Sequence, residues 1–154
     1  MPISLQVRFC PRSVSRLTQK KDFVMISKKT KSHNVPWEQE YGYSQAVKVG
    51  DTIYLSGQVS HDDKGNFVGI GDMEMQMRQC YSNVQKVLAH YGATMDNIVD
   101  EVLFVTDMES AFAAAVKCRQ EVFAGTPVVA STIVQIQRLG FPEFMIEIKC
   151  VAKV

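Results

Sequence analysis

Hydrophobic residues recur every three to four positions in two segments of the chain, and this spacing predicts two helices. The first covers residues 72–91, where Asp72 is placed to cap the helix start and Gly92 to end it. The second covers residues 110–123, and the Gly-Thr-Pro sequence at 125–127 is expected to end it. The methionine stripe of the first helix, Met73 and Met77, is expected to pack in the core.

Runs rich in β-branched and aromatic residues predict strands on either side of the two helices and between them. Residues 43–58 are expected to form two strands with a tight turn at 50–51, and residues 97–107 one strand buried near its middle. Residues 129–139 and 144–154 alternate in polarity and predict two more strands. The order β-β-helix-β-helix-β-β favours an α+β fold, with one mixed β-sheet and two helices packed on one face. The opposite face would be apolar and exposed in a single copy, so we expect an oligomer interface there.

Charge is distributed unevenly along the 154 residues, although the net charge is only +1. Residues 1–31 hold eight basic side chains and one acid, whereas residues 32–154 hold nine Lys or Arg and fifteen Asp or Glu. The acidic body offers no positive field for a phosphate backbone, so a nucleic acid partner is unlikely on this ground. No apolar run approaches 18 residues, and therefore no membrane partner is expected.

The basic N-terminal segment, residues 1–33, is expected to be a disordered extension of a single domain formed by residues 34–154. The segment before Asp22 is rich in Arg and lacks the hydrophobic run of a secretory signal. Its composition weakly resembles an organelle transit peptide. The alternatives are a simple disordered arm, or an upstream start codon with Met25 as the true first residue.

The cysteines and histidines do not follow a metal-binding pattern. No two cysteines are closer than 32 residues, which excludes CxxC and zinc-ribbon spacing. We interpret them as reduced residues, most of them in the core, and therefore expect a cytoplasmic protein. The four cysteines are Cys10, Cys80, Cys118 and Cys150, and the equally scattered histidines are His33, His61 and His90.

Several segments together resemble the YjgF/RidA family, the reactive intermediate deaminases formerly called L-PSP endoribonucleases. The most specific match is residues 43–58, YSQAVKVGDTIYLSGQ, in which a strand, a turn and Ser-Gly-Gln occur together. Supporting matches are Asn83-Val84 in the first helix, residues 102–107 and residues 146–152. The resemblance implies a chorismate-mutase-like fold and a homotrimer with ligand pockets in the clefts between subunits. It also implies hydrolysis of small reactive imines and enamines without a metal or organic cofactor.

The resemblance also assigns roles to individual residues. Glu147 matches the acidic residue that positions a water at the imine carbon, so it is the candidate catalytic residue. Tyr43 matches the pocket tyrosine, and Ser56 and Gly57 match the strand end that lines the cleft. Glu147 would act as general acid and base if the low polarity of the cleft raised its pKa.

The family's carboxylate-binding arginine is missing from this chain. Alignment through Arg138 and Leu139 places Ser131 at its position, whereas alignment through Pro127 places Val129 there. Neither side chain forms a forked ion pair with a carboxylate, so classical 2-aminoacrylate-type substrates are expected to bind poorly.

Ser131 and Thr132 are the candidate ligand-binding residues of this strand, and near Val116 the family's asparagine is also replaced. Arg138 or Arg119 would be sources of a replacement charge, against the simpler interpretation that both are solvated.

Each candidate residue also has a purely structural interpretation. Glu147 would be an ordinary solvated glutamate of an alternating strand, and Tyr43 would pack at an interface. Ser56 and Gly57 would mark a close approach of two backbones.

The sequence leaves three functions open for the whole protein: a cofactor-free imine hydrolase, a non-catalytic trimer that binds a metabolite or a protein, and an RNA-directed nuclease. The acidic body makes the nuclease the weakest of the three.

Overall fold

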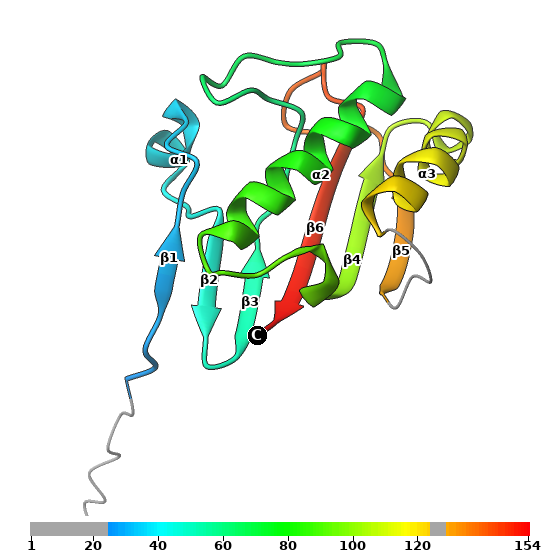
Figure 1. Cartoon of the computed structure of the whole chain (residues 1–154). Coiled ribbons are helices and arrows are strands. Elements are labelled where there is room, and N and C mark those ends of the chain that lie inside the picture. The colour runs from blue at the N-terminus through cyan, green and yellow to red at the C-terminus, as the bar shows by residue number, and fades with distance from the viewer. Residues whose placement is uncertain (1–24, 124–128) are drawn as a thin grey trace, which may run out of the picture.

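The computed structural model of the chain describes residues 25–123 and 129–154. A single β-sheet forms one layer of the molecule, and helices cover it (Figure 1). The elements in chain order are β1 (Lys29–Lys31), α1 (Pro36–Tyr41), β2 (Ala46–Val49), β3 (Thr52–Leu55), α2 (Met73–Ala89), the 3-10 helix η1 (Met95–Asn97), β4 (Ile98–Val105), α3 (Met108–Val122), β5 (Ala130–Gln135) and β6 (Ile146–Lys153). No helix among the described residues is long and apolar enough to cross a membrane.

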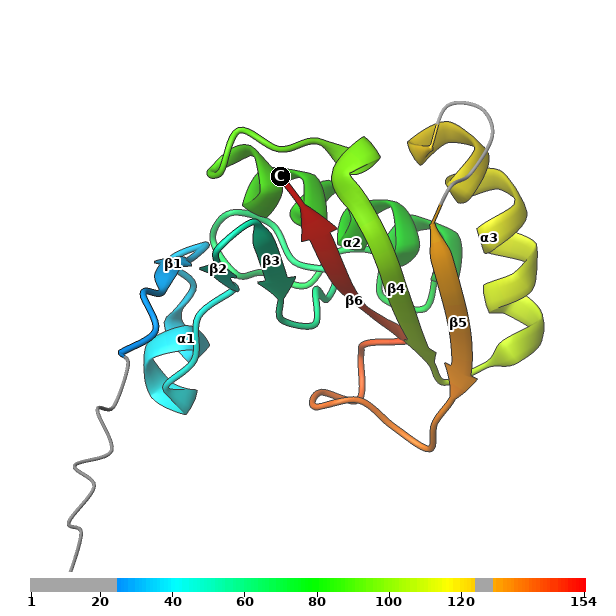
Figure 2. The same ribbon diagram turned by 90° about the horizontal axis from the view of Figure 1, so that it is seen from below.

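The six strands lie in the order β1-β2-β3-β6-β4-β5. The pair β4 and β5 is parallel and every other neighbouring pair is antiparallel. Parallel neighbours need a long crossover connection, and α3 supplies it. The two long helices, α2 and α3, lie on the same side of the sheet (Figure 2). The predicted α+β fold, a mixed sheet with two helices on one face, is therefore confirmed.

Alternation along β6 divides the sheet into a helix-covered face and a second face, which we call the open face. Ile146, Ile148, Cys150 and Ala152 are buried beneath the helices. Strand register then assigns to the open face six apolar side chains together with four charged ones. These residues are Val47, Tyr54, Val102, Phe104, Val134 and Val151, with Asp100, Glu147, Lys149 and Lys153.

The N-terminal boundary of the ordered structure corrects the sequence-based one. Residues 29–33 were expected to belong to a disordered extension, but Lys29–Lys31 pair with β2 as strand β1. The hydroxyl of Tyr91 donates to the backbone oxygen of Lys29 at 3.0 Å and to that of Ala46 at 3.2 Å. These contacts tie the edge strand to β2 and to the chain that follows α2, which local composition alone does not reveal.

The short helix α1 was also not predicted, although local signals mark it. Pro36 occupies its first position and Gly42 ends it with a φ of 68°. Glu38 is buried, and its carboxylate accepts hydrogen bonds from the Ser32 hydroxyl and from the backbone N–H of His33 at 2.8 Å. This carboxylate therefore fixes the connection between β1 and α1.

Helix and strand ends differ modestly from the predicted ones. Asp72 caps α2 as predicted, accepting from the backbone N–H of Met75 at 2.9 Å. Helix α3 begins at Met108, two residues early, because the Asp107 carboxylate caps it. The predicted stop at 125–127 lies outside the described residues. Strand β5 ends at Gln135, so Arg138 and Leu139 lie in the following loop.

Candidate functional site

Glu147 lies directly against Gly57. The chain that leaves β3 runs antiparallel to β6, with the N–H of Gln58 donating to the Ile148 oxygen at 2.8 Å and the reverse bond at 3.0 Å. A Cβ atom on Gly57 would come within 1.9 Å of Oε1 of Glu147. The carboxylate thus occupies space that only glycine leaves open, and this close approach explains the Gly of the Ser-Gly-Gln segment.

The surroundings of Glu147 favour its protonated form. Its carboxyl is partly buried on the open face, opposite Phe104 in the strand register. Burial raises the pKa of Glu147, and the positive charge of Lys149 only partly opposes this shift. Within residues 25–123 and 129–154, no hydrogen bond or ion pair engages the carboxylate. A carboxyl with a raised pKa and spare oxygens is suited to exchange protons with a ligand or a water.

Tyr43 lies close enough to Glu147 to respond to its charge. Burial raises the pKa of the Tyr43 phenol, and the charges of Glu38 and Glu147 raise it further. The side chain is 38% exposed, and its oxygen accepts a hydrogen bond from Gln45 Nε2 at 3.3 Å. The phenol therefore stays neutral and keeps its own proton for a ligand.

Ser56 completes what we call the Glu147 cluster: Tyr43, Ser56, Gly57 and Glu147. The Ser56 hydroxyl donates to the backbone oxygen of Ser44 at 2.7 Å, so its proton is used to join the ends of β2 and β3. The fold thus brings together the four candidates at this end of the sheet. Their role in binding or catalysis remains a prediction.

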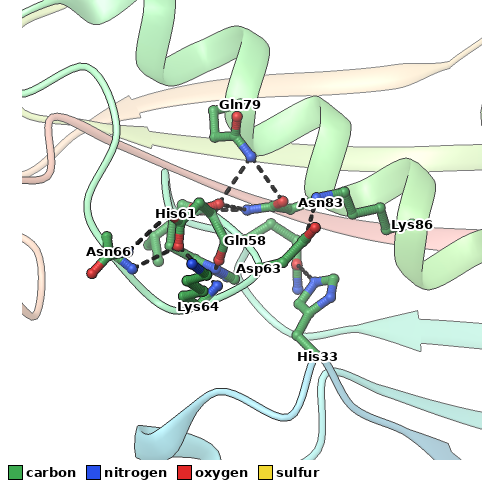
Figure 3. Close-up of polar contacts among 11 residues, drawn as sticks. His33, Gln58, His61, Asp63, Lys64, Asn66, Gln79, Asn83 and Lys86 are labelled. Atoms are coloured by element: carbon green, nitrogen blue, oxygen red, sulfur yellow. Dashed lines mark hydrogen bonds and ion pairs between the residues drawn. The ribbon is translucent and has the colours of Figure 1, made fainter.

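A buried network of side-chain amides supports the backbone beneath this cluster. Nε2 of Gln58 donates to Oε1 of Gln45 at 2.6 Å. Oε1 of Gln58 lies 2.9 Å from Nε2 of His33 (Figure 3). Because this oxygen only accepts, the proton of the His33 ring is placed on Nε2. Burial lowers the pKa of His33, which keeps the ring neutral.

Helix α2 holds the chain that follows Gln58. Nδ2 of Asn83 donates to the backbone oxygens of Val59 and His61, both at 3.0 Å, and Gln79 Nε2 reaches the same His61 oxygen at 2.9 Å (Figure 3). Asn83 is therefore a structural residue. The fold also brings the His61 and His33 rings to a centroid distance of 5.4 Å, which their spacing in sequence conceals. In the described part of the chain, no three metal-binding side chains gather.

Ser131 and Thr132 lie away from the Glu147 cluster. Glu147 pairs with Phe104 of β4, which in turn pairs with Val134 of β5. Strand spacing then places Ser131 and Thr132 on the order of 12–14 Å from Glu147, two strands away. Thr132 shares the open face, whereas Ser131 points to the helix-covered face. Within one copy of the chain, Ser131 and Thr132 are therefore not brought together with the Glu147 cluster.

Ser131 instead lines a hollow between the last helix and the edge strand, which we call the α3–β5 groove. Its volume is about 560 Å³. The wall is mostly apolar and includes three polar side chains. The lining residues are Phe112, Ala115, Val116, Arg119, Gln120, Ser131 and Ile133.

An ion pair beside this groove escaped the sequence analysis. Glu101 is 0% exposed in the middle of β4, and its Oε2 accepts from the Tyr81 hydroxyl at 3.1 Å. Nη1 of Arg119 contacts Oε1 of Glu101 and the hydroxyl of Ser131, the latter at 2.5 Å. Arg119 is therefore not a solvated helix residue, whereas Arg138 is exposed in its loop. The sequence signal for this pair was Glu101 itself, a charged residue within the apolar segment that forms β4.

The cysteines take no part in either location. Cys80, Cys118 and Cys150 are buried free thiols, in agreement with the predicted core role, and Cys10 lies outside the described residues. Burial raises the pKa of all three thiols. They therefore remain protonated near neutral pH and are poor nucleophiles.

Comparisons with known proteins agree with this fold. RutC family protein YjgH from Escherichia coli (strain K12) is 33% identical over 115 residues, covering 75% of this chain and 85% of that protein. A solved structure of the protein YJGH is similar to this chain with a TM-score of 0.69 and 29% identity, covering 85% of this chain and 95% of its own. A shorter match joins the chain to 2-iminobutanoate/2-iminopropanoate deaminase from Dermatophagoides farinae, 36% identical over 63 residues, or 41% of this chain and 49% of that protein.

The family assignment rests on a match to most of the chain. The sequence model described as Endoribonuclease L-PSP matches residues 35–154. This range contains the Glu147 cluster, the α3–β5 groove and five of the six strands. The chain therefore belongs to the Endoribonuclease L-PSP family, the group of the YjgF and RutC proteins.

Proposed function

We propose that this protein is a cofactor-free hydrolase of small reactive imines and enamines, with an active site assembled between the subunits of a homotrimer. The observation that carries the proposal is the state of Glu147. Its carboxyl is partly buried, has a raised pKa and is held against Gly57 with its oxygens available. General acid–base catalysis near neutral pH needs such a group.

Assembly between copies is supported by the separation of the candidate residues. The Glu147 cluster and Ser131 lie two strands apart, and Ser131 points to the other face of the sheet. The open face exposes Tyr54 and Val134, large side chains that a second copy would cover. In the proposed trimer, the Glu147 cluster of one subunit faces the α3–β5 groove of the next.

Imine hydrolysis requires one water, both of whose protons must reach the imine nitrogen. The ionised Glu147 takes a proton from the water as the water oxygen bonds to the imine carbon, and the carboxyl then gives this proton to the nitrogen to form a carbinolamine. The carboxylate next takes the hydroxyl proton of the carbinolamine and passes it to the same nitrogen as the carbon–nitrogen bond breaks, so that a carbonyl compound and ammonia leave. An enamine enters the same route after protonation at carbon, which the protonated Glu147 supplies. No oxidant, reductant or metal is needed for this balance.

Two further observations support a hydrolase over a nuclease. The matched relative from Dermatophagoides farinae is named as an imine deaminase. Residues 32–154 contain fifteen acidic and nine basic side chains, which is unfavourable for binding a phosphate backbone. The nuclease name of the family model is therefore not extended to this chain.

The catalytic test replaces the carboxylate with its neutral isostere. We expect the full chain to release ammonia from imines generated in situ faster than water alone, and Glu147→Gln to remove this acceleration. Glu109→Gln, at an exposed position in the first turn of α3, is the matched control and should leave the rate unchanged. Binding of imines or their products without turnover in the wild type would instead identify a non-catalytic binding protein.

The assembly test uses complementation between two inactive variants. Glu147→Gln disables one half of the proposed site, and Val116→Trp fills the α3–β5 groove of the other half. Mixed trimers contain some interfaces with both halves intact, so mixing after dissociation should restore part of the activity. A stable lone subunit in sedimentation, or no recovery in trimers shown to be mixed, would contradict a shared site.

A further inference from the structure

We propose that Gln45 is a positioning residue of the Glu147 cluster: it fixes the direction of the Tyr43 hydroxyl, so that the hydroxyl proton points toward the ligand. The inference rests on the proposed function in one respect, because turnover is one of its two readouts. It adds a requirement that the carboxyl of Glu147 does not set. The ligand atom that contacts Tyr43 must be an acceptor, such as a carbonyl oxygen or an imine nitrogen.

The direction of the buried amides is set first at Gln58, which is 1% exposed. Its Nε2 donates to the backbone oxygen of Ser56 at 3.0 Å. Its Oε1 lies 2.9 Å from Nε2 of His33 on the other side (Figure 3). A backbone oxygen only accepts, so the amide nitrogen must face Ser56. The reversed amide would bring two oxygens together in a buried place, which is costly.

Gln45 takes its own direction from Gln58. Nε2 of Gln58 also donates to Oε1 of Gln45 at 2.6 Å, so the oxygen of the Gln45 amide faces Gln58 and its nitrogen faces the opposite way. Gln45 is 2% exposed, and water therefore does not compete for its amide. Burial alone would raise the pKa of Glu38, but hydrogen bonds that include one from Gln45 lower it. This agrees with a nitrogen on that side of the amide.

The last member of the chain is the Tyr43 hydroxyl, whose oxygen lies 3.3 Å from Nε2 of Gln45. Burial raises the pKa of the Tyr43 phenol, and hydrogen bonds from Trp37 and Gln45 oppose this rise, as donors to a phenol oxygen do. Neither an amide nitrogen nor an indole nitrogen can accept. Both neighbours thus use electron pairs of the oxygen, and neither takes its proton. The proton is left for the open side of Tyr43, which is 38% exposed.

A donor that is fixed before the ligand arrives favours one kind of contact. The charge of Glu147 acts on Tyr43, so the two groups lie near each other at the same end of the sheet. A ligand between them would accept a hydrogen bond from Tyr43 while Glu147 exchanges protons with it. Because the hydroxyl is already directed, little reorganisation is needed on binding. A group that only donates, such as an ammonium, would face the Tyr43 proton and is disfavoured.

The first readout needs no reaction. In the Raman spectrum of tyrosine, the intensity ratio of the Fermi doublet rises when the phenol oxygen accepts a hydrogen bond and falls when the hydroxyl mainly donates. The difference between wild type and Tyr43→Phe isolates Tyr43 among the five tyrosines of the full chain. We expect the ratio of an accepting phenol in the wild type. We expect a lower ratio in Gln45→Met, measured against Gln45→Met/Tyr43→Phe, because one donor to the oxygen is removed.

The second readout is turnover of imines generated in situ, analysed as a double-mutant cycle. Gln45→Met should lower kcat/KM about three- to tenfold, as for the loss of one neutral hydrogen bond. In the Tyr43→Phe background the same change should alter kcat/KM by less than about twofold, because no hydroxyl is left to direct. A purely structural Gln45 would instead lower kcat/KM by the same factor in both backgrounds.

The matched control is Gln39→Met, which makes the same exchange at an exposed position of α1. It should leave both the Raman ratio and kcat/KM unchanged. Circular dichroism and the melting transition check that each variant is folded. If Gln45→Met does not fold, the wild-type ratio still decides, since the ratio of a phenol that only donates would overturn the proposal.

The remaining outcomes also bear on the proposal. An unchanged ratio in folded Gln45→Met, equal losses of kcat/KM in both backgrounds, or a lower ratio that Gln39→Met reproduces would overturn it. A wild type that does not hydrolyse imines refutes the proposed function alone. The Raman ratios of the wild type and Gln45→Met then decide the direction of the Tyr43 hydroxyl, because they are measured without any substrate.

Discussion

Glu101 and Glu147 stand on neighbouring strands, β4 and β6, yet their carboxylates point to opposite faces of one sheet. Glu101 lies under the helices with no exposed surface and is held by Tyr81 and Arg119. Glu147 lies on the open face, with burial but without such partners among the described residues. Because hydrogen bonds and an ion pair engage the Glu101 carboxylate, Glu101 is a structural group. The Glu147 carboxylate lacks such partners and is available for chemistry.

The contrast follows from the physics of buried charge. A buried carboxylate is stable only when a cation and hydrogen-bond donors replace the lost water. Where they are lacking, the group instead becomes easier to protonate. The same residue type thus gives a fixed ion pair on one face and a proton-exchanging group on the other.

The largest expected effect comes from breaking the pair on the helix-covered face. Arg119→Met leaves the Glu101 charge alone in the core and should lower the free energy of unfolding by about 3–5 kcal/mol. Glu101→Gln/Arg119→Met removes both charges and should recover most of this loss. Urea unfolding of the wild type and the variants measures the difference. A double variant as unstable as the single one would show that lost packing, and not the unpaired charge, sets the effect.

The next effect comes from crowding the carboxylate on the open face. Gly57→Ala places a Cβ where Oε1 of Glu147 now lies, so we expect the carboxylate to be displaced and stability to fall by about 1–3 kcal/mol. Ammonia release from imines should fall with it. The matched control is Gly140→Ala, since a Cβ there meets nothing within 4 Å. Equal behaviour of the two variants would contradict the close packing of Gly57 on Glu147.

A smaller effect is expected from removing one donor to Glu101. Tyr81→Phe keeps the ring beside Phe123 but deletes the hydroxyl that Glu101 accepts from, and should cost about 1–2 kcal/mol. Tyr41→Phe, at an exposed position in α1, should change the free energy of unfolding little. The same unfolding measurement applies. A Tyr81→Phe variant as stable as wild type would show that Arg119 alone satisfies the carboxylate.

The smallest effect concerns the pH dependence set by Glu147. Its pKa is raised above the ordinary value of 4.5, so the folded state holds the proton longer than the unfolded state. Stability should therefore fall as the pH rises from about 4.5 through the raised pKa. Glu147→Gln removes this slope and should be more stable than wild type at neutral pH, by less than about 1 kcal/mol because water still reaches the carboxyl.

The measurement for this prediction is the melting temperature across pH 4 to 8, compared with that of Glu109→Gln. The gain of Glu147→Gln over wild type should vanish at the acidic end, where both states are protonated. A constant gain at every pH would mean that the change in stability does not come from ionisation. A loss at neutral pH would mean that the carboxylate has a partner in the assembled protein.

The sequence predicted the fold well wherever an element carries its own pattern. The periodicity of residues 72–91 and the acid before the first buried methionine identified α2 and its cap. Strands β2 and β3 were readable from their composition and turn. Strand β1 was missed because its three residues are exposed and are held by contacts with β2 and Tyr91, which are distant in sequence.

The candidate site was predictable only in part. Glu147, Gly57 and Tyr43 came from the resemblance to a family, and periodicity alone would have left Glu147 as an ordinary surface residue. The ion pair of Glu101 and Arg119 depends on the register of β4 and on the placement of α3 across it. Neither is encoded in local composition, so the pairing of Glu101 with Arg119 is visible only in the structure.

The reach of Arg119 from α3 to both β4 and β5 has one more consequence. The same guanidinium anchors the helix to the sheet and lines the α3–β5 groove, so the shape of the groove and the stability of the fold depend on one side chain. A molecule that pulls the guanidinium outward must loosen its hold on the sheet. A substitution of Arg119 therefore alters the groove and the fold together, and it leaves the Glu101 charge buried alone unless Glu101 is changed as well.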